Sequence, residues 1–186
     1  PWNAFRSISY NPSQHSVLVN VGEKYALCVL PKQPTGAVEP GSVLEDSGCF
    51  ATFVARNRFV VYNKSAEALE VRDLDNKITK SIKIEGTVKD VVSGGPGSVL
   101  LLQPKAVVHL DVQQGKKIDE IAVNNVKYVS WSPDGQYLAL LSKHTVTIVN
   151  KKLEMITSMH ETIRIKSAAW DETGILIYST LNNIKY

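Results

Sequence analysis

Short apolar stretches alternate with polar, turn-forming residues along most of the chain. The pattern is clearest in residues 126–150, where apolar and β-branched residues gather at Lys127–Trp131, Tyr137–Leu141 and Thr145–Val149. Such residues suit a pleated, half-buried strand. Between the first two stretches, Ser132–Gly135 predicts a turn, because proline presets φ, aspartate bonds to the local backbone and glycine accepts a positive φ. We therefore predict three strands joined by two turns, and such a small sheet needs neighbours to bury both faces.

The same pattern recurs at a regular interval. The aromatic-to-glycine segment Trp131–Gly135 has a counterpart at Trp170–Gly174, 39 residues later. The polar residues that end the third predicted strands, Asp73, Asp111 and Asn150, are 38 and 39 residues apart. A fourth predicted strand follows each of them, at Ile78–Ile84, Lys117–Val123 and Leu153–Met159. Four strands that repeat about every 40 residues are typical of β-propeller blades, whereas an ordinary β-sandwich gives no reason for this regular spacing.

The repeat predicts an all-β fold: a partial WD-repeat β-propeller with about four and a half four-stranded blades of a larger ring. The predicted blades span residues 1–48, 49–86, 87–124, 125–161 and 162–186, the last of them truncated. Because the chain begins at Pro1 and ends within a predicted strand, we expect it to be a segment of a longer protein.

The first unit is less regular than the others. Strands are predicted at Ser7–Tyr10, Ser16–Asn20 and Lys24–Leu30. Pro31–Ser47 is rich in proline and glycine with few large apolar residues, so it predicts a long surface loop. Later in the chain, Leu153–His160 could form a helix, but its place in the repeat favours a strand.

No segment has the pattern of a catalytic, cofactor-binding or metal site. The histidines and cysteines do not share metal-ligand spacing; they are His15, His109, His144, His160, Cys28 and Cys49. The serines lack a G-x-S-x-G elbow, and the glycine-rich Ser93–Ser98 lacks the GK[ST] ending of a phosphate-binding loop. We therefore expect no enzyme activity, no cofactor and no small-molecule substrate.

Two kinds of repeated residue have structural explanations. The acidic residues Asp134, Asp171 and Glu172 occupy the same turn in successive units, which favours capping of the backbone over acid–base chemistry. Aromatic residues recur at one blade position, and we expect them to fill the space between blades rather than to stack on bases; they are Tyr10, Phe53, Trp131 and Trp170.

The charge is mildly positive, with 21 Lys and Arg against 18 Asp and Glu, a net charge of +3. Four lysines lie along one fourth strand and its exit: Lys77, Lys80, Lys83 and Lys89. A nucleic-acid or membrane patch is one interpretation. The favoured one is that these lysines keep an exposed edge strand from pairing with other chains. No apolar run approaches 18 residues, so no transmembrane helix is predicted.

The last third of the chain, Val126–Tyr186, resembles the second WD-repeat propeller of coatomer alpha subunits. The most specific stretches are Ala139–His144, Asn150–Glu154, His160–Ser167 and Ala169–Gly174, with earlier matches at Phe53–Phe59 and Asp111–Gln114. The Gly-His and Trp-Asp pairs usual in WD repeats are absent. Only Asp73, Asp111 and Asn150 keep the polar residue that ends the third strand, so the repeats are degenerate, as in that family.

The resemblance implies a cytosolic, non-enzymatic coat protein that is peripheral on Golgi membranes and COPI vesicles and acts in Golgi-to-ER and intra-Golgi transport. It implies assembly with other coatomer subunits, beta-prime and epsilon among them, and no nucleic acid. In that family the first propeller recognises dilysine cargo tails, so we carry over no cargo-binding residue. The alternatives are a propeller that binds anionic lipid or nucleic acid, an enzyme propeller, and a scaffold outside the COPI coat.

Overall fold

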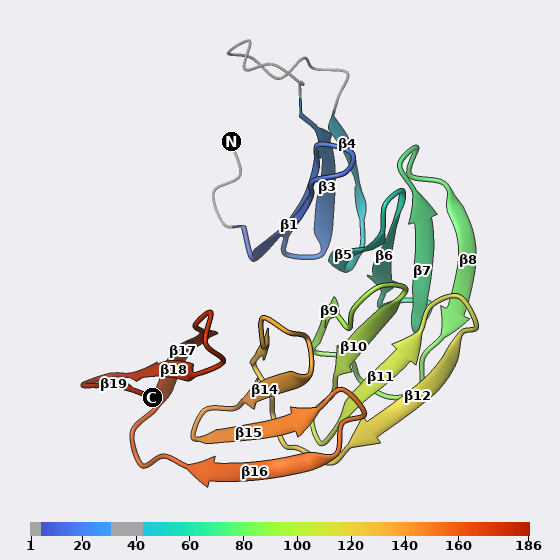
Figure 1. The fold of residues 1–186 in the computed structure, drawn as a ribbon. Helices are drawn as coiled ribbons and strands as arrows, with labels where there is room; N and C mark the ends of the chain where they lie inside the picture. The colour runs from blue at the N-terminus through green and yellow to red at the C-terminus, as the bar shows by residue number, and fades with distance from the viewer. Residues whose placement is uncertain (1–4, 31–42) are drawn as a thin grey trace. The chain divides into compact units, whose positions relative to one another are not determined.

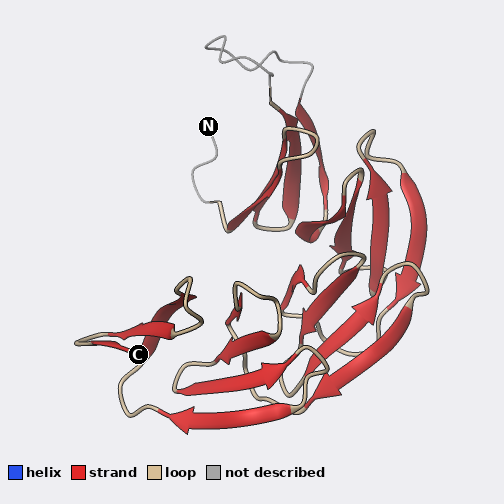
Figure 2. Ribbon diagram, viewed as in Figure 1, coloured by secondary structure: helices blue, strands red, loops and turns tan. Residues whose placement is uncertain are grey.

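The computed structural model describes residues 5–30 and 43–186. These residues form strands and turns and contain no helix (Figure 1, Figure 2). Their strands group into five sheets, four with four strands and one with three. In every sheet, strands that follow one another in sequence are hydrogen-bonded neighbours. This up-and-down order agrees with the repeat of short strands seen in the sequence.

The strand bounds are as follows. The first sheet contains β1 (Ser7–Asn11), β2 (Ser16–Val21), β3 (Lys24–Val29) and β4 (Val43–Ser47). The second contains β5 (Cys49–Ala55), β6 (Arg58–Asn63), β7 (Ala68–Asp73) and β8 (Ile78–Lys83). The third contains β9 (Asp90–Ser93), β10 (Ser98–Leu102), β11 (Val107–Asp111) and β12 (Lys116–Ile121). The fourth contains β13 (Tyr128–Trp131), β14 (Tyr137–Leu141), β15 (Thr145–Asn150) and β16 (Met155–His160), and the fifth contains β17 (Ile165–Trp170), β18 (Leu176–Thr180) and β19 (Ile184–Lys185).

The chain divides into two compact units. Unit 1 consists of Pro1–Gly86, Asp90–Leu100 and Leu110–Lys116. Unit 2 consists of Thr87–Lys89, Leu101–His109 and Lys117–Tyr186. The first and second sheets therefore belong to unit 1 and the fourth and fifth to unit 2, while the third has residues in both.

In unit 1, the core lies between the first two sheets. The first sheet contributes Leu18, Tyr25 and Leu27, and the second contributes Ala51, Phe59 and Val61. The Tyr25 and Phe59 rings meet edge to face with centroids 5.8 Å apart, a favoured geometry for aromatic pairs. Asn20 adds a polar tie, because its side-chain amide donates to the Ala51 carbonyl and accepts from the Ala51 amide. Burial of these side chains explains why the two sheets stay together.

In unit 2, a second core joins the fourth and fifth sheets. Ala139, Leu141 and Val146 of the fourth sheet pack with Ile165 and Tyr178 of the fifth. Trp170 lies against this cluster, and its indole Nε1 donates a 2.9 Å hydrogen bond to the Ser130 carbonyl of the fourth sheet. The ring thus fills apolar space while its polar edge finds a partner.

The predicted repeat of an aromatic residue followed by a glycine turn is confirmed. Trp131 is the last residue of β13 and Trp170 is the last residue of β17, each the first strand of its sheet. Gly135 and Gly174 close the following turns with φ of +65° and +86°. These values lie in the left-handed region that glycine adopts at low cost, which explains its presence in both turns.

Two expectations about the first sheet are wrong. The predicted loop Pro31–Ser47 does not extend to its end, because Val43–Ser47 is strand β4 and pairs with β3; residues 31–42 lie outside the described part. Tyr10 was expected in a core, yet it is 52% exposed. Its β-sheet partner Val17 is half-buried, and both lie on the face of the sheet opposite Leu18. Phe53 and Trp170 do pack against the cores, as expected.

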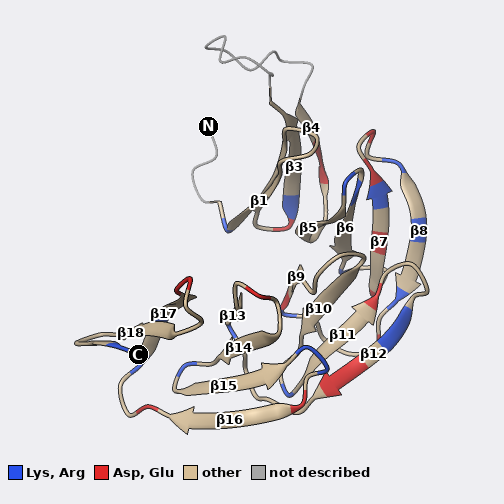
Figure 3. Ribbon diagram, viewed as in Figure 1, with Lys and Arg blue, Asp and Glu red and all other residues tan. Residues whose placement is uncertain are grey.

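The fourth strands β8 and β16 lie at sheet edges, and most of their residues are exposed. Leu153–His160 contains β16 rather than a helix, and all six residues of β16 are exposed. β8 is also a sheet edge and carries Lys80 and Lys83 (Figure 3). Lysines on an exposed strand disfavour pairing with other chains, so their position agrees with that interpretation.

Candidate functional site

A buried group of polar side chains lies between the two sheets of unit 1. Arg72 on β7 is at its centre, with a side chain only 8% exposed. Its guanidinium contacts Glu70 of the same strand at 2.5 Å and Asp46 of β4 at 2.5 Å. It also donates to the Tyr25 hydroxyl of β3 at 2.8 Å and to the Asn76 side chain at 3.2 Å. We call these five residues the Arg72 cluster.

The electrostatics of the Arg72 cluster follow from burial and from one central cation. Burial raises the pKa of Tyr25 to about 12, although the nearby Arg72 charge opposes this. Burial also disfavours ionisation of Asp46, but hydrogen bonds from Arg72, the Ser47 amide and Asn76 outweigh it and lower the pKa of that carboxyl. The tyrosine therefore stays neutral and the aspartate stays ionised at neutral pH.

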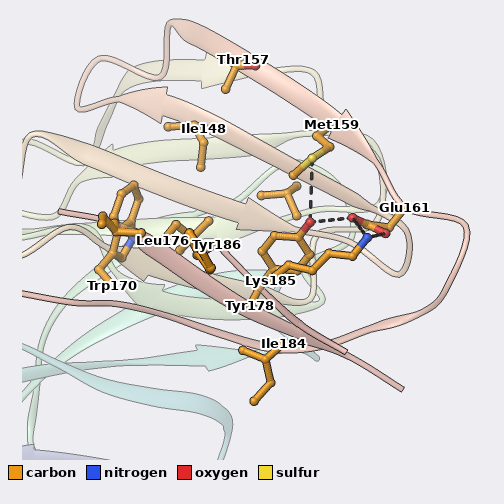
Figure 4. Close-up of a pocket in the computed structure, with 12 residues that line it drawn as sticks. Ile148, Thr157, Met159, Glu161, Trp170, Leu176, Tyr178, Ile184, Lys185 and Tyr186 are labelled. Carbon is orange, nitrogen blue, oxygen red and sulfur yellow. Dashed lines mark hydrogen bonds and ion pairs between the residues drawn. The ribbon is translucent and has the colours of Figure 1, made fainter. Parts of the chain in front are cut away.

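In unit 2, a pocket of about 700 Å³ opens between β15–β16 and β18–β19. Most of its walls are apolar, and Figure 4 shows Trp170, Leu176 and Tyr186 at one part of the wall and Tyr178, Glu161 and Lys185 at another. The charged residues that line the pocket, Glu161 and Lys185, lie together at one end of it (Figure 4). A pocket of this kind accepts an apolar group and offers a few polar contacts that would orient it.

Three polar side chains at this end bond to one another. Glu161 is 8% exposed and accepts hydrogen bonds from the Tyr178 hydroxyl at 2.5 Å and from Lys185 Nζ at 2.9 Å. The tyrosine bond and then the lysine lower the pKa of Glu161. Burial, followed by the hydrogen bond and charge of Glu161, raises the pKa of Tyr178 to about 12. We call these three residues the Glu161 cluster.

Neither cluster is equipped for catalysis. The pKa of Asp46 and that of Glu161 are lowered and both carboxylates are already bonded, while the two tyrosines are harder to ionise than usual, which is opposite to what a general base or nucleophile needs. Among the described residues, no three His, Cys, Asp or Glu side chains could together hold a metal ion. Cys28 and Cys49 are free, buried thiols whose pKa is raised by burial, so neither resembles an activated nucleophile.

Capping of turns was predicted for Asp134, Asp171 and Glu172, and the structure shows it for the two aspartates. Asp171 accepts hydrogen bonds from the amides of Thr173 and Ile175. Asp134 accepts from the Gln136 amide and from the Ser132 hydroxyl. The capping carboxylate stands at a different position in each turn. Directly after the tryptophan, the first turn has the hydroxyl of Ser132 and the second has the carboxylate of Asp171. Glu172 is exposed, and its side chain makes no hydrogen bond within the described part of the chain.

The sequence did not reveal the residues of either cluster. Glu70 and Arg72 offered the one usable signal, since opposite charges two apart on an apolar strand point to the same face. The other members meet through long-range contacts: Tyr25 is 47 residues from Arg72, and Glu161 is 24 residues from Lys185. Of the histidines, His144 and His160 come together, with ring centroids 6.1 Å apart.

No helix in the described part of the chain is long and apolar enough to cross a membrane.

Comparison with known proteins identifies close relatives along the whole chain. The family model for the COPA/B second beta-propeller matches residues 1–186. Over 100% of its length, the chain is 70% identical to coatomer subunit alpha of Saccharomyces cerevisiae and 42% identical to the putative coatomer subunit alpha of Schizosaccharomyces pombe. It is 42% identical to coatomer subunit alpha-2 of Oryza sativa subsp. japonica over 97% of its length. The chain spans 16% of each yeast relative and 15% of the rice protein.

A solved structure shares the fold without sharing the sequence. Kuenenia stuttgartiensis hydrazine synthase superimposes with a TM-score of 0.67 over 95% of this chain and 56% of its own, at 15% identity. At this identity the likeness concerns the fold alone. Together with the family model, it confirms the predicted all-β, partial propeller.

Proposed function

Because this chain belongs to the COPA/B second beta-propeller family, we propose that it is a non-enzymatic scaffold module of the COPI vesicle coat. The 70% identity to a coatomer alpha subunit over the full chain is the observation that supports this most strongly. A scaffold role also agrees with the chemistry of the two polar clusters, which join neighbouring sheets and leave no activated group. In this proposal the blades span residues 1–48, 49–86, 87–124, 125–161 and 162–186.

The proposed setting is the cytoplasm, peripherally on Golgi membranes and COPI vesicles. There the module would hold other coatomer subunits, including beta-prime and epsilon, in place during Golgi-to-ER and intra-Golgi transport. Sheets with fixed cores suit this role, since a rigid frame presents its loops to partners in a constant geometry. No cofactor, nucleic acid or small-molecule substrate takes part.

A segment exchange tests the proposal. This chain would replace the corresponding segment of Saccharomyces cerevisiae coatomer subunit alpha, the 70% identical relative. We expect the hybrid to co-purify with the other coat subunits in the wild-type ratio and to support retrieval of cargo from the Golgi. A hybrid that is soluble and folded but does not assemble with any coat subunit would overturn the proposal. A second hybrid carrying Arg72→Met serves as the control for loss of folding.

A further inference from the structure

Unit 2 has a surface on which exposed cations gather at one end of its sheets. Short loops between neighbouring strands require antiparallel pairing, so successive connections alternate between the two ends of a sheet. The loops after β10, β12, β14 and β16 therefore lie at the same end of their sheets. They and the start of β17 carry five exposed cations, which we call the basic end: Lys105, Lys127, Lys143, Arg164 and Lys166.

Backbone hydrogen bonds hold these loops in place, both within a sheet and between neighbouring sheets. The Asn125 amide, after β12, donates to the Pro104 carbonyl beside Lys105. The Lys127 amide donates to the Leu141 carbonyl, two residues before Lys143. The amide of Ile165, next to Arg164, donates to the Lys143 carbonyl at 2.9 Å. The loops that carry the cations are therefore bonded to one another, so the cations keep fixed positions relative to each other.

A groove of about 360 Å³ lies within this surface. Residues 122–125 form one side and residues 142–145 the other, with Lys143 and His144 among the lining side chains. Most of the remaining lining groups are amides and hydroxyls, from Asn124, Asn125, Ser142, Thr145, Thr147 and Ser158. Lys89 reaches the groove from the third sheet and donates to the Asn125 side chain at 2.7 Å. Thr147 and Ser158 already bond to each other, while the exposed Asn124 side chain can bond to the backbone of an extended peptide.

Carboxylates do not neutralise the basic end. Within the described residues, no ion pair involves any of its five cations. Glu161 is the one acidic residue in these loops, and its carboxylate is turned to Tyr178 and Lys185 (Figure 4). The opposite end differs: the turn between β17 and β18 contains Asp171 and Glu172 and is red in Figure 3. The loops of the basic end therefore carry a net positive charge, whereas the opposite end combines Asp171 and Glu172 with Lys151 and Lys152.

From this geometry we infer that the basic end of unit 2 is a docking surface for an acidic, extended segment of a partner protein. The cations would pair with Asp and Glu side chains while the groove bonds the backbone between them. A membrane surface is less well matched, because a layer of headgroups would meet the cations but would not enter the groove between residues 122–125 and 142–145. Complementary charge at exposed loops contributes chiefly to association rate and specificity, which suits a reversible contact.

The test uses the full-length protein, a fluorescein-labelled peptide of alternating Glu and Ser, and fluorescence anisotropy at about 50 mM and 150 mM salt. The double variant Lys127→Gln/Lys143→Gln removes two charges at the basic end. The control Lys151→Gln/Lys152→Gln removes two exposed charges of the same unit at the opposite end. We expect the first to weaken binding about fivefold and the control to leave it within about 1.5-fold, with the difference shrinking at higher salt.

Three outcomes would overturn the inference. Wild-type protein could fail to bind the peptide at low salt, or both double variants could weaken binding equally, which would indicate non-specific attraction. Alternatively, the Lys127→Gln/Lys143→Gln variant could weaken binding to vesicles of phosphatidylcholine with phosphatidylserine but leave peptide binding unchanged. That result would indicate a membrane-binding surface. Circular dichroism of both variants checks that the substitutions leave the fold unchanged.

Discussion

The Arg72 cluster of unit 1 and the Glu161 cluster of unit 2 occupy similar settings but are built around opposite charges. In each, a tyrosine hydroxyl meets oppositely charged side chains beside an apolar core that joins two sheets. The first cluster surrounds a cation with two carboxylates, whereas the second surrounds a carboxylate with a hydroxyl and an ammonium group. Degenerate repeats can therefore keep a polar tie between sheets without keeping the residues that form it.

Each cluster has one partly exposed charged partner, Asp46 at 38% and Lys185 at 42%, but the Arg72 cluster has a second charged partner, Glu70, that is buried. Arg72 and Glu70 are both 8% exposed, so their pairing occurs away from water. In the Glu161 cluster, Lys185 is 42% exposed and can be replaced by water at little cost. Loss of the central residue should therefore harm unit 1 more than loss of a peripheral residue harms unit 2.

Replacing Arg72 by methionine is expected to have the largest effect. The substitution keeps the apolar stem but leaves the buried Glu70 carboxylate without its counter-ion and with a hydrogen bond from the Asn63 side-chain amide, and we expect a loss of about 3–5 kcal/mol of unfolding free energy. Urea denaturation followed by circular dichroism measures it. Arg58→Met, on the neighbouring strand with an exposed side chain, is the control and should change stability by less than about 0.5 kcal/mol. A loss below about 1 kcal/mol for Arg72→Met would show that the cluster contributes little net stability.

The two units also differ in the length of the segment that connects one sheet to the next. Gly48 alone connects β4 to β5 in unit 1, at φ +149°, whereas residues 161–164 connect β16 to β17 in unit 2. A Cβ at Gly48 would lie 2.2 Å from Val61 Cγ1 in the core. We expect Gly48→Ala to cost about 3 kcal/mol, combining overpacking and backbone strain.

The matched control for this substitution is Gly135→Ala. Gly135 also has a positive φ, of +65°, but no atom lies within 4 Å of the added Cβ. Only backbone strain remains, so we expect a cost of about 1 kcal/mol. If urea denaturation shows the same loss of unfolding free energy for both variants, the structure adjusts around the added Cβ near Val61 at no cost.

In the Glu161 cluster, Tyr178→Phe should have a moderate effect. It removes one hydrogen bond to a carboxylate while the ring still fills the core, so the expected loss is about 1–2 kcal/mol. Lys185→Met removes the more exposed partner and should cost less than about 0.5 kcal/mol. The ratio of the two, measured by the same denaturation, tests whether the buried hydroxyl or the ammonium group is the main partner of Glu161.

Much of the fold could be read from the sequence because local chemistry determines it. A strand end and a glycine turn are predicted by local residue types alone at Trp131–Gly135 and at Trp170–Gly174. β4 could not be predicted for the opposite reason: among the described residues it pairs with β3 alone, and Leu44 and Glu45 are exposed, so no apolar alternation marks it.

The polar clusters could not be predicted in the same way. A charged residue in a sequence is normally exposed, and whether Arg72 or Glu161 is buried depends on partners from other strands. The basic end is an intermediate case. Its lysines are visible in the sequence, but Lys127 and Lys143 become neighbours only through the bond between the Lys127 amide and the Leu141 carbonyl.

The smallest effect, and the most direct test of opposite central charges, is the ionisation of the two tyrosines. Tyr25 and Tyr178 both have a pKa raised to about 12, mainly by burial. Since these folded-state values exceed the ordinary value near 10, the stability that they confer is fully present below pH 10 and is lost as pH rises through 12. At neutral pH the wild-type protein is unaffected.

The central charges should move these two values in opposite directions. The Arg72 charge lowers the pKa of Tyr25, so Arg72→Met raises it further. Glu161 raises the pKa of Tyr178, so Glu161→Gln brings it down towards 10. Near-ultraviolet absorbance titrations, with Tyr25→Phe and Tyr178→Phe to assign each transition, measure both shifts. Movement of the two values in the same direction would show that burial alone governs them, and that the sign of the central charge is unimportant to either cluster.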